Sequence, residues 1–430
     1  MKIQELYPRT HRPERVIQFG TGGFLRGFFD WMLEKTNQAG LTDMSCVMVE
    51  STGSGAAARM AQQDYIYTHV MRGAEGVEKT VVSVLSRGLS AKAEWDQVLV
   101  LADDPAMRFI VSNTTEAGIA YDPAAKMDDA PPASFPAKLT ALLARRMEKG
   151  LPGFILLPME LLDDNGRILR DMVLRHGADW GLGEAFRDYV LNENIFCDTL
   201  VDRINTGRIS PEEAEVEYED AFLNASEYYH LWVISGPDCV REELPFDKAG
   251  LNVEFTRDIR RFHTRKVRIL NGAHTSTVAY AMNRGIATVG EAMADEDASA
   301  FLKKNLYEEI IPSMDMDEAE LLPYAEAVLT RFRNPYIRHE WRAISLNSVS
   351  KFRVRVLPSI LEYEKKFGKG PENLLKAFGE LIRLYRTQEV KDDPAAIAAM
   401  RAGSVRDVLA NEALWGEDLS RFAAEVEAVL

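Results

Sequence analysis

Short, continuously apolar runs separated by helical stretches fill the first part of the chain, and this alternation constrains its fold most. The runs lie at residues 16–19, 46–49, 81–85, 107–112 and 154–158. They lack the polar–apolar alternation of a half-exposed strand, so we expect both faces of each strand to be covered. Between the first two runs, residues 24–40 place apolar side chains at helical spacing and end at a glycine. Strands and helices in alternation predict an α/β, Rossmann-like doubly wound sheet.

The pattern changes near Thr256. Beyond it the chain has few strand candidates and long stretches with helical periodicity, at residues 275–285, 298–314, 317–332 and 371–386. A chain of 430 residues also exceeds what one hydrophobic core usually organises. We therefore expect a Rossmann-like cofactor domain over residues 1–255 and a mostly α-helical catalytic domain over residues 256–430.

Composition and charge exclude several classes of partner. The net charge of -15 argues against nucleic acid, whose backbone needs a clustered basic surface. The chain has no apolar run near the roughly 18 residues that span a bilayer, and its first residues lack the apolar core of a signal peptide. Cys46, Cys197 and Cys239 have no metal-ligand spacing and are too few for a disulfide framework. We expect a cytoplasmic protein with a small-molecule partner and no membrane contact, and the sequence leaves the oligomeric state open.

A glycine-rich turn directly follows the first expected strand. Gly20, Gly22 and Gly23 precede Phe24, with which the first long helical stretch begins. Glycines at this place let the backbone approach a pyrophosphate, whose charge is met by free N–H groups and the helix dipole. The position of the usual third glycine holds Leu25, so the fingerprint is partial and a plain turn is the alternative.

The second expected strand ends at Glu50. Dinucleotide-binding folds place an acid there, and it binds the ribose hydroxyls of the adenosine. Glu50 lies further from the glycines than the usual distance of about 20 residues, which a longer first helix would explain. A carboxylate at this place repels a 2'-phosphate, so Glu50 predicts NAD rather than NADP. The alternative is a solvated acid in the loop at residues 50–55.

A lysine, an asparagine and a histidine gather in one expected helix of the second domain. On a regular α-helix, Lys266, Asn271 and His274 would lie at about 0°, 140° and 80° around the axis, as one polar fan. Ketone reduction needs a hydride donor, a proton donor and a group that holds the carbonyl oxygen as charge develops. A lysine can supply the proton, an amide can hold the oxygen, and the histidine can orient the substrate or the lysine. From spacing alone, the alternative is a solvated lysine beside a packing glycine.

These residues resemble the signature of the polyol-specific long-chain dehydrogenases, the mannitol dehydrogenase family. The glycine turn at residues 20–28 and the Val-Asp-Arg-Ile segment at residues 201–204 resemble further motifs of that family. Blocks at residues 112–119, 134–140, 268–275 and 331–337 look like its uronate-reducing branch, and the similarity runs from about residue 13 to 387. The resemblance implies reversible, NAD-dependent and metal-independent reduction of a keto sugar acid.

The resemblance also implies roles for single residues. It makes Lys266 the general acid and base, with Asn271 and His274 as partners, and it places Asp202 and Lys351 at the substrate. One departure concerns the asparagine that helps bind the oxyanion in mannitol-specific members. The matching position, four residues before Asn165, holds Leu161 after Glu160, so this donor is missing or supplied from elsewhere.

The carboxylate of a sugar acid requires a cation, because an unpaired buried carboxylate is costly. The candidates are Lys351, Arg268 and Arg353, and family position favours Lys351, in a cleft expected between the two domains. Rival interpretations are another uronate reductase, a polyol dehydrogenase, and a catalytically inactive sugar-acid sensor. A metal-dependent dehydrogenase is disfavoured because the seven histidines are scattered and no cysteine pair could complete a site.

Overall fold

The computed structural model of the chain describes residues 1–114 and 118–430. It divides into two compact units, Met1–Ile259 and Arg260–Leu430. Thr256, where the sequence pattern changes, is the final residue of the last strand of the first unit, β13 (Val253–Thr256). Part of the block at residues 112–119 lies outside the described residues.

The first unit is built on a six-stranded sheet in which all neighbouring strands run parallel. Its order is β5-β2-β1-β6-β7-β8. This is the doubly wound order, whose ligand crevice lies at the carboxyl ends of the strands where the order reverses, between β1 and β6. The predicted α/β class and Rossmann-like sheet are therefore confirmed. The strands are β1 (Glu14–Phe19), β2 (Ser45–Glu50), β5 (Leu85–Ser90), β6 (Phe109–Ser112), β7 (Ile155–Pro158) and β8 (Ile195–Phe196).

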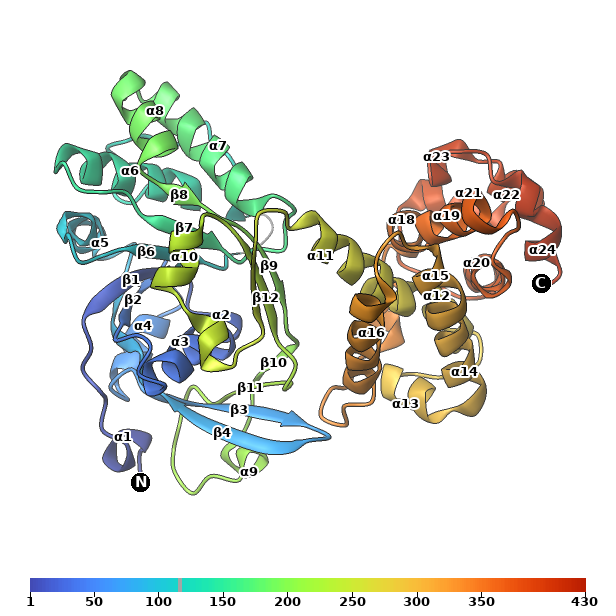
Figure 1. Ribbon diagram of the computed structural model, residues 1–430, viewed down its shortest axis with the longest axis horizontal. Helices are drawn as coiled ribbons and strands as arrows, with labels where there is room; N and C mark the ends of the chain where they lie inside the picture. Colours follow the sequence, from blue (N-terminus) through green and yellow to red (C-terminus); the bar gives the residue numbers. More distant parts are fainter. Residues whose placement is uncertain (115–117) are drawn as a thin grey trace. The chain divides into compact units, whose positions relative to one another are not determined.

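Both faces of this sheet are buried, which explains the continuous apolar runs. Successive residues of β1 enter different cores: Val16 shares one with Phe28 and Trp232, and Ile17 shares the other with Leu139. Figure 1 shows the helices of the second core gathered along one side of the sheet. They are α5 (Trp95–Val100), α6 (Phe135–Glu148), α7 (Asn165–Asp179) and α8 (Gly183–Asn192).

Two of the sequence-based elements are wrong in detail. The run at residues 81–85 is not one strand, because β4 (Gly76–Val82) ends within it and β5 begins at Leu85 in a different sheet. The helix expected over residues 24–40 is broken at Phe28, whose φ of -126° and ψ of -81° leave the helical region. It becomes α2 (Gly23–Gly27) and α3 (Phe29–Gln38).

Two smaller sheets complete the first unit, and the sequence pattern did not indicate them. One has the order β10-β11-β3-β4 and the other β13-β12-β9. Their strands pair across long stretches of chain, as β11 does with β3. The additional strands are β3 (Tyr67–Gly73), β9 (Asp198–Asp202), β10 (Asn205–Arg208), β11 (Asn224–Ser226) and β12 (Leu231–Ser235). The remaining helices are α1 (Ile3–Leu6), α4 (Ala56–Ala61), α9 (Pro211–Ala214) and α10 (Asp238–Glu243).

The second unit is helical, as predicted, and the strands of the described chain all lie in the first unit. Its α-helices are α11 (Arg260–Arg265), α12 (Gly272–Met282), α13 (Val289–Ala294), α14 (Glu296–Lys304), α15 (Ile311–Ser313), α16 (Glu318–Phe332), α17 (Trp341–Ile344), α18 (Ser348–Arg355), α19 (Leu357–Phe367), α20 (Glu372–Thr387), α21 (Pro394–Arg401), α22 (Val405–Leu409), α23 (Glu412–Trp415) and α24 (Ala423–Glu427). Two π-helical segments, Lys266–Asn271 and Asn305–Ile310, interrupt this series.

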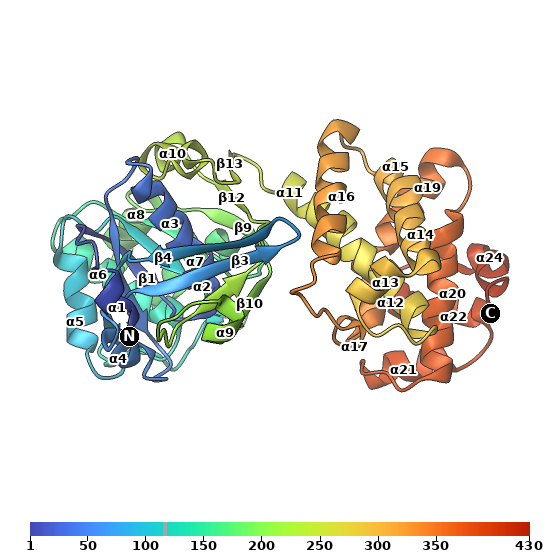
Figure 2. The ribbon, with the colours of Figure 1, turned by 90° about the horizontal axis from the view of Figure 1, so that it is seen from below.

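Helix α12 lies at the centre of the second unit. It contacts α14, α17, α18 and α20 (Figure 1 and Figure 2). Its residues from Gly272 to Ala281 are all buried, so its position is set by packing on every side. None of the described helices combines the length and apolar character that crossing a membrane requires.

Candidate active site

The glycine turn is built so that only glycine fits at its first position. Gly20 has a φ of +131°, a region that other residues rarely adopt. A Cβ atom at Gly20 would also lie 2.8 Å from Leu25 Cδ1 and 3.2 Å from the carbonyl oxygen of Asn113. Because Asn113 follows β6, the turn lies at the reversal of strand order where doubly wound folds bind dinucleotides.

The next residues of the turn leave room for a ligand. A Cβ atom built on Gly22, which immediately precedes α2, meets no atom within 4 Å. Phe24 is only partly buried and stacks on Phe28 with ring centroids 5.0 Å apart. An open backbone at the start of a helix, at this edge of the sheet, fits a pyrophosphate group.

Gly27 supplies the close helix packing that the position of Leu25 does not. The Cβ atom of a larger residue at Gly27 would lie 2.6 Å from Asn224 Nδ2 and 2.7 Å from Asn205 Nδ2. Both side-chain amides donate to the carbonyl oxygen of Gly23, and the Nδ2 of Asn224 lies 2.9 Å from it. The four-stranded sheet, which carries both asparagines, therefore fixes the start of α2. Gly27, Asn205 and Asn224 were not predicted from the sequence, although a glycine two positions after the expected one was a visible signal.

Glu50 ends β2 as expected, but its carboxylate is already bound by the backbone. It is buried and accepts N–H donors from Gly55 at 2.6 Å and from Ala57 at 2.9 Å. Burial opposes its charge, yet these backbone hydrogen bonds hold the pKa of Glu50 below its ordinary value. The charged carboxylate thus orders the loop before α4, and its contact with a ribose stays a prediction.

The Val-Asp-Arg-Ile segment joins two sheets of the first unit. Asp202 is buried at the end of β9. Arg203 is also buried and donates to the carbonyl oxygens of Gly27 at 2.7 Å and of Glu227 at 2.9 Å. Its guanidinium lies 4.3 Å from the ring centroid of Trp31. Arg203 therefore ties this segment to the end of α2, beneath the glycine turn.

The asparagine near the position of the missing oxyanion donor cannot replace that donor. The Asn165 side-chain amide donates to the carbonyl oxygens of Pro158 and Glu160, both at 3.1 Å. Its Oδ1 accepts the backbone N–H of Thr199 at 2.8 Å, so its polar atoms are bound to the backbone. Leu161 is 63% exposed and carries no polar atom on its side chain, so it cannot supply the donor either.

Lys266 and Asn271 lie on a π-helical turn rather than on a regular α-helix. The N–H of Gly272 bonds to the carbonyl oxygen of Val267, five residues back. The angles expected for an α-helix are therefore wrong, because each π turn holds one residue more. Residues five apart, such as Lys266 and Asn271, come closer to one face than an α-helix allows. π turns of this kind are frequent at functional sites.

His274 lies on the following α-helix in an apolar and cationic setting. Its ring stacks on Phe332 at 4.2 Å between centroids and meets His339 edge-on at 4.8 Å. Burial, with the nearby His339, Arg331 and Arg355, lowers the pKa of His274 well below its ordinary value. The imidazole is therefore neutral at pH 7. Its Nε2 atom is buried and has no hydrogen-bond partner among the described residues.

The three cations proposed for a substrate carboxylate have different surroundings. Arg268 is buried and bonded to Ser359 Oγ at 2.7 Å, Ser313 Oγ at 2.9 Å and Glu362 Oε2 at 2.8 Å. Lys351, near the start of α18, is partly buried and donates its Nζ to the carbonyl oxygen of Ile344 at 2.9 Å. Arg353 is exposed.

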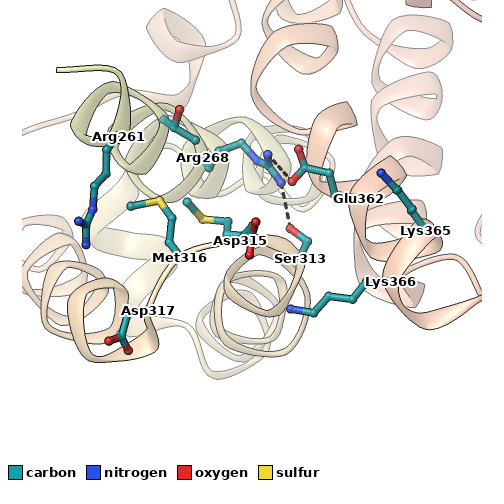
Figure 3. Close-up of a pocket in the computed structure, with 11 residues that line it drawn as sticks. Arg261, Arg268, Ser313, Asp315, Met316, Asp317, Glu362, Lys365 and Lys366 are labelled. Carbon is teal, nitrogen blue, oxygen red and sulfur yellow. Dashed lines mark hydrogen bonds and ion pairs between the residues drawn. The ribbon is translucent and has the colours of Figure 1, made fainter. Parts of the chain in front are cut away.

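The second unit contains a cavity of about 930 Å³ that includes Arg268 but none of Lys266, Asn271, His274 and Lys351. Figure 3 shows Arg268 joined to Glu362 and Ser313 across it. Lys366, also in its lining, donates to the carbonyl oxygen of Pro312 at 2.8 Å. Arg268 thus lines this cavity, and its hydrogen bonds connect the π-helical segment to α15 and α19.

Comparison with known proteins gives the family. The model of the Mannitol dehydrogenase Rossmann domain matches residues 14–248, and that of the Mannitol dehydrogenase C-terminal domain matches residues 258–430. The chain belongs to the mannitol dehydrogenase family. It is 41% identical to an altronate oxidoreductase of Yersinia enterocolitica, over 96% of this chain and 92% of the relative. It is 42% identical to an altronate oxidoreductase of Escherichia coli, over 98% and 94%. It is therefore an oxidoreductase that acts on CH–OH groups.

Solved structures of the family have the same fold. D-Sorbitol dehydrogenase in its substrate-free form matches with a TM-score of 0.84 and 21% identity, over 98% of this chain and 93% of that chain. Mannitol 2-dehydrogenase of Pseudomonas fluorescens, in a ternary complex with NAD and D-mannitol, matches with a TM-score of 0.72 and 20% identity, over 98% and 92%.

Gly27→Ala should weaken cofactor binding and destabilise the first unit. The added methyl group would push α2 away from Asn205 and Asn224, which hold Gly23 in the turn. Overpacking of this kind costs about 1–3 kcal/mol. We expect a lower unfolding midpoint and weaker binding in an NADH titration. Gly290→Ala is the control, since its methyl group would meet no atom closer than 4.0 Å. Equal effects of both changes would refute this role of Gly27.

His274→Gln should make the stability of the protein less sensitive to acid. An unfolded histidine has a pKa of about 6.5, whereas the pKa of His274 in the folded chain is well below its ordinary value because of burial. Below about pH 6.5 the unfolded chain binds a proton that the folded chain does not, so the free energy of unfolding falls by up to about 1.4 kcal/mol per pH unit. Urea unfolding between about pH 7.5 and 5.5 should show a shallower decline in the variant. An unchanged slope would mean that His274 is not held neutral.

Proposed function

We propose that the chain catalyses the reversible, NAD-linked reduction of D-tagaturonate to D-altronate. The observation that carries this proposal is its likeness to altronate oxidoreductases over almost the whole chain. The Lys266, Asn271 and His274 set, on one continuous helical run, supports it because this set supplies what ketone reduction requires.

The chemistry divides between the cofactor and three side chains. Bound NADH supplies the hydride to the carbonyl carbon. Lys266 gives a proton to the carbonyl oxygen and takes it back in the reverse direction. Asn271 donates its amide N–H to the same oxygen, and the π turn brings it toward the face of Lys266. His274, being neutral, directs its free Nε2 at the substrate and acts without changing charge.

The cofactor is proposed to lie on the first unit. Gly20, Gly22 and Gly23 bring open backbone to the pyrophosphate, and Phe24 covers it from the first turn of α2. Glu50 accepts hydrogen bonds from the ribose hydroxyls. Its carboxylate oxygens have further lone pairs beside those that the loop N–H groups occupy. Its negative charge then disfavours a 2'-phosphate.

Substrate contacts are proposed for Asp202 and Lys351 through their family positions. Arg268 acts differently, as a positioning residue, because its guanidinium is bonded to three side chains of the helical unit. The hydroxyl groups of the sugar acid require hydrogen-bond donors and acceptors. The carboxylate of Asp202 can accept such bonds, and the ammonium group of Lys351 can donate them.

The alternative functions differ from the proposed one in substrate, in turnover or in the need for a metal ion. A fructuronate reductase or a mannitol-type dehydrogenase would differ only in substrate, whereas a sugar-acid sensor would bind and not turn over. A metal-dependent dehydrogenase would need a ligand set, and the described residues include no group of three or more His, Cys, Asp or Glu side chains placed to hold a metal ion. NADH oxidation measured with tagaturonate, fructuronate and fructose decides between them. The proposal requires tagaturonate to give the highest kcat/KM, and no turnover with any of the three would contradict it.

Lys266→Ala should lower kcat by at least about 100-fold, the usual size of a general-acid contribution. The Kd of NADH should change little, because the proposed cofactor residues lie in the first unit. Lys303→Ala, at an exposed lysine of α14, is the control and should keep wild-type turnover. If the Lys266 variant retains more than about a tenth of wild-type kcat, the lysine is not the proton donor.

Glu50→Ser should weaken a clear preference of the wild-type protein for NADH over NADPH. The carboxylate opposes the 2'-phosphate of NADPH, and serine removes that charge. The ratio of kcat/KM values for the two cofactors measures the preference. Because Glu50 also binds the loop N–H groups, Glu50→Gln serves as a second variant that keeps an acceptor oxygen. Equal use of both cofactors by the wild-type protein would refute this role.

A further inference from the structure

Arg355, the last residue of α18, is a partly buried cation without a partner among the described residues. Its guanidinium carries five N–H donors, yet it makes no hydrogen bond or ion pair within residues 1–114 and 118–430. Burial lowers the pKa of Arg355, and no carboxylate of the described residues offsets that effect. An unpaired guanidinium in such a place loses hydration without gaining a partner, which is costly in free energy.

The position of Arg355 connects it to the catalytic residues. A Cβ atom built on Gly272 would lie 3.2 Å from the carbonyl oxygen of Arg355, so the end of α18 rests on the residue that follows Asn271. Helix α18 contacts both α12 and the π turn. Lys351 lies one helical turn earlier, at a spacing of four residues that places both side chains on one face of α18.

The surroundings of Arg355 are cationic. Its charge contributes to the lowered pKa of both His274 and Lys351. The other groups that affect the pKa of His274 are His339 and Arg331, which are also basic. Asp392, the acid that raises the pKa of Lys351, is bonded to Tyr385 and to the backbone N–H of Val349. The region thus combines basic groups with the unpartnered Nε2 of His274.

The other cations proposed from the sequence are less suited to bind a ligand. Arg268 is bonded to Glu362 and two serines in the wall of the cavity. Arg353 is exposed, and a Cβ atom on Gly416 would lie 2.9 Å from its Nη2, so its side chain lies against the turn after α23. Lys351 already donates to the carbonyl oxygen of Ile344.

We propose that Arg355 binds the carboxylate of the sugar-acid substrate, with its planar fork on the two carboxylate oxygens, while Lys266 and Asn271 hold the carbonyl group. This inference rests on the proposed reduction of a keto uronate. A guanidinium matches the geometry of a carboxylate and forms two parallel hydrogen bonds with it. Arg355 therefore sets the preference for a sugar acid over a neutral ketose.

The test compares two substrates that differ at the charged group. D-Tagaturonate carries a carboxylate where D-tagatose carries a hydroxymethyl group. In Arg355→Met, we expect KM for tagaturonate to rise by about 10- to 100-fold, the range of a charge-assisted hydrogen bond, with kcat within about threefold. Turnover of tagatose should change less than about threefold. Arg355→Lys, which keeps the charge and loses the fork, should lie between the wild-type protein and Arg355→Met.

Arg353→Met is the matched control on the same helix and should leave both substrates unaffected. Lys351→Met tests whether Lys351, rather than Arg355, binds the substrate carboxylate. A loss in Arg355→Met that is equal for both substrates, or a carboxylate-specific loss in Lys351→Met but not in Arg355→Met, would overturn the inference. Failure of the wild-type protein to reduce tagaturonate would instead refute the proposed function, so the two failures are distinguishable. An unchanged helical circular-dichroism signal and urea unfolding midpoint of each variant show that the second unit is folded.

Discussion

The change from α-helical to π-helical hydrogen bonding at Lys266–Asn271 determines how the side chains of the proposed catalytic set, Lys266, Asn271 and His274, are arranged around their helix. One added residue in the turn brings Asn271 toward the face of Lys266 and leaves His274 on the regular helix that follows. Gly272 permits this arrangement, because the Cβ atom of any other residue at this position would lie only 3.2 Å from the carbonyl oxygen of Arg355. The π-helical segment with α12 and the end of α18 therefore depend on each other for their positions.

Much of the fold could be predicted because its signals are local. The strands of the parallel sheet are buried on both faces, so each appears as a continuous apolar run, and the long helices of the second unit show their period directly. The smaller sheets gave no such signal, since β3 pairs with β11 across more than half of the first unit. The break at Phe28 and the π turn also depend on tertiary packing rather than on local preference.

The candidate site could be predicted in part. The glycines and the Lys266 motif could be proposed because they resemble motifs of a family that the comparisons confirm, and Glu50 because it ends the second strand. The sequence did not show which cationic side chains are paired in the folded chain. Arg268 is bound by Ser313, Ser359 and Glu362 from other helices, whereas Arg355 has no such partner in the described part of the chain, and only the folded chain distinguishes them.

We propose that the π-helical turn and α18 bind one sugar acid, with the proton donor at its carbonyl end and a guanidinium at its carboxylate. A crystal structure with NAD and D-altronate bound is the decisive measurement. It should place the reacting hydroxyl oxygen within hydrogen-bonding distance of Lys266 Nζ and the carboxylate on Arg355. A carboxylate bound instead at Arg268, in the cavity that excludes Lys266 and His274, would contradict it.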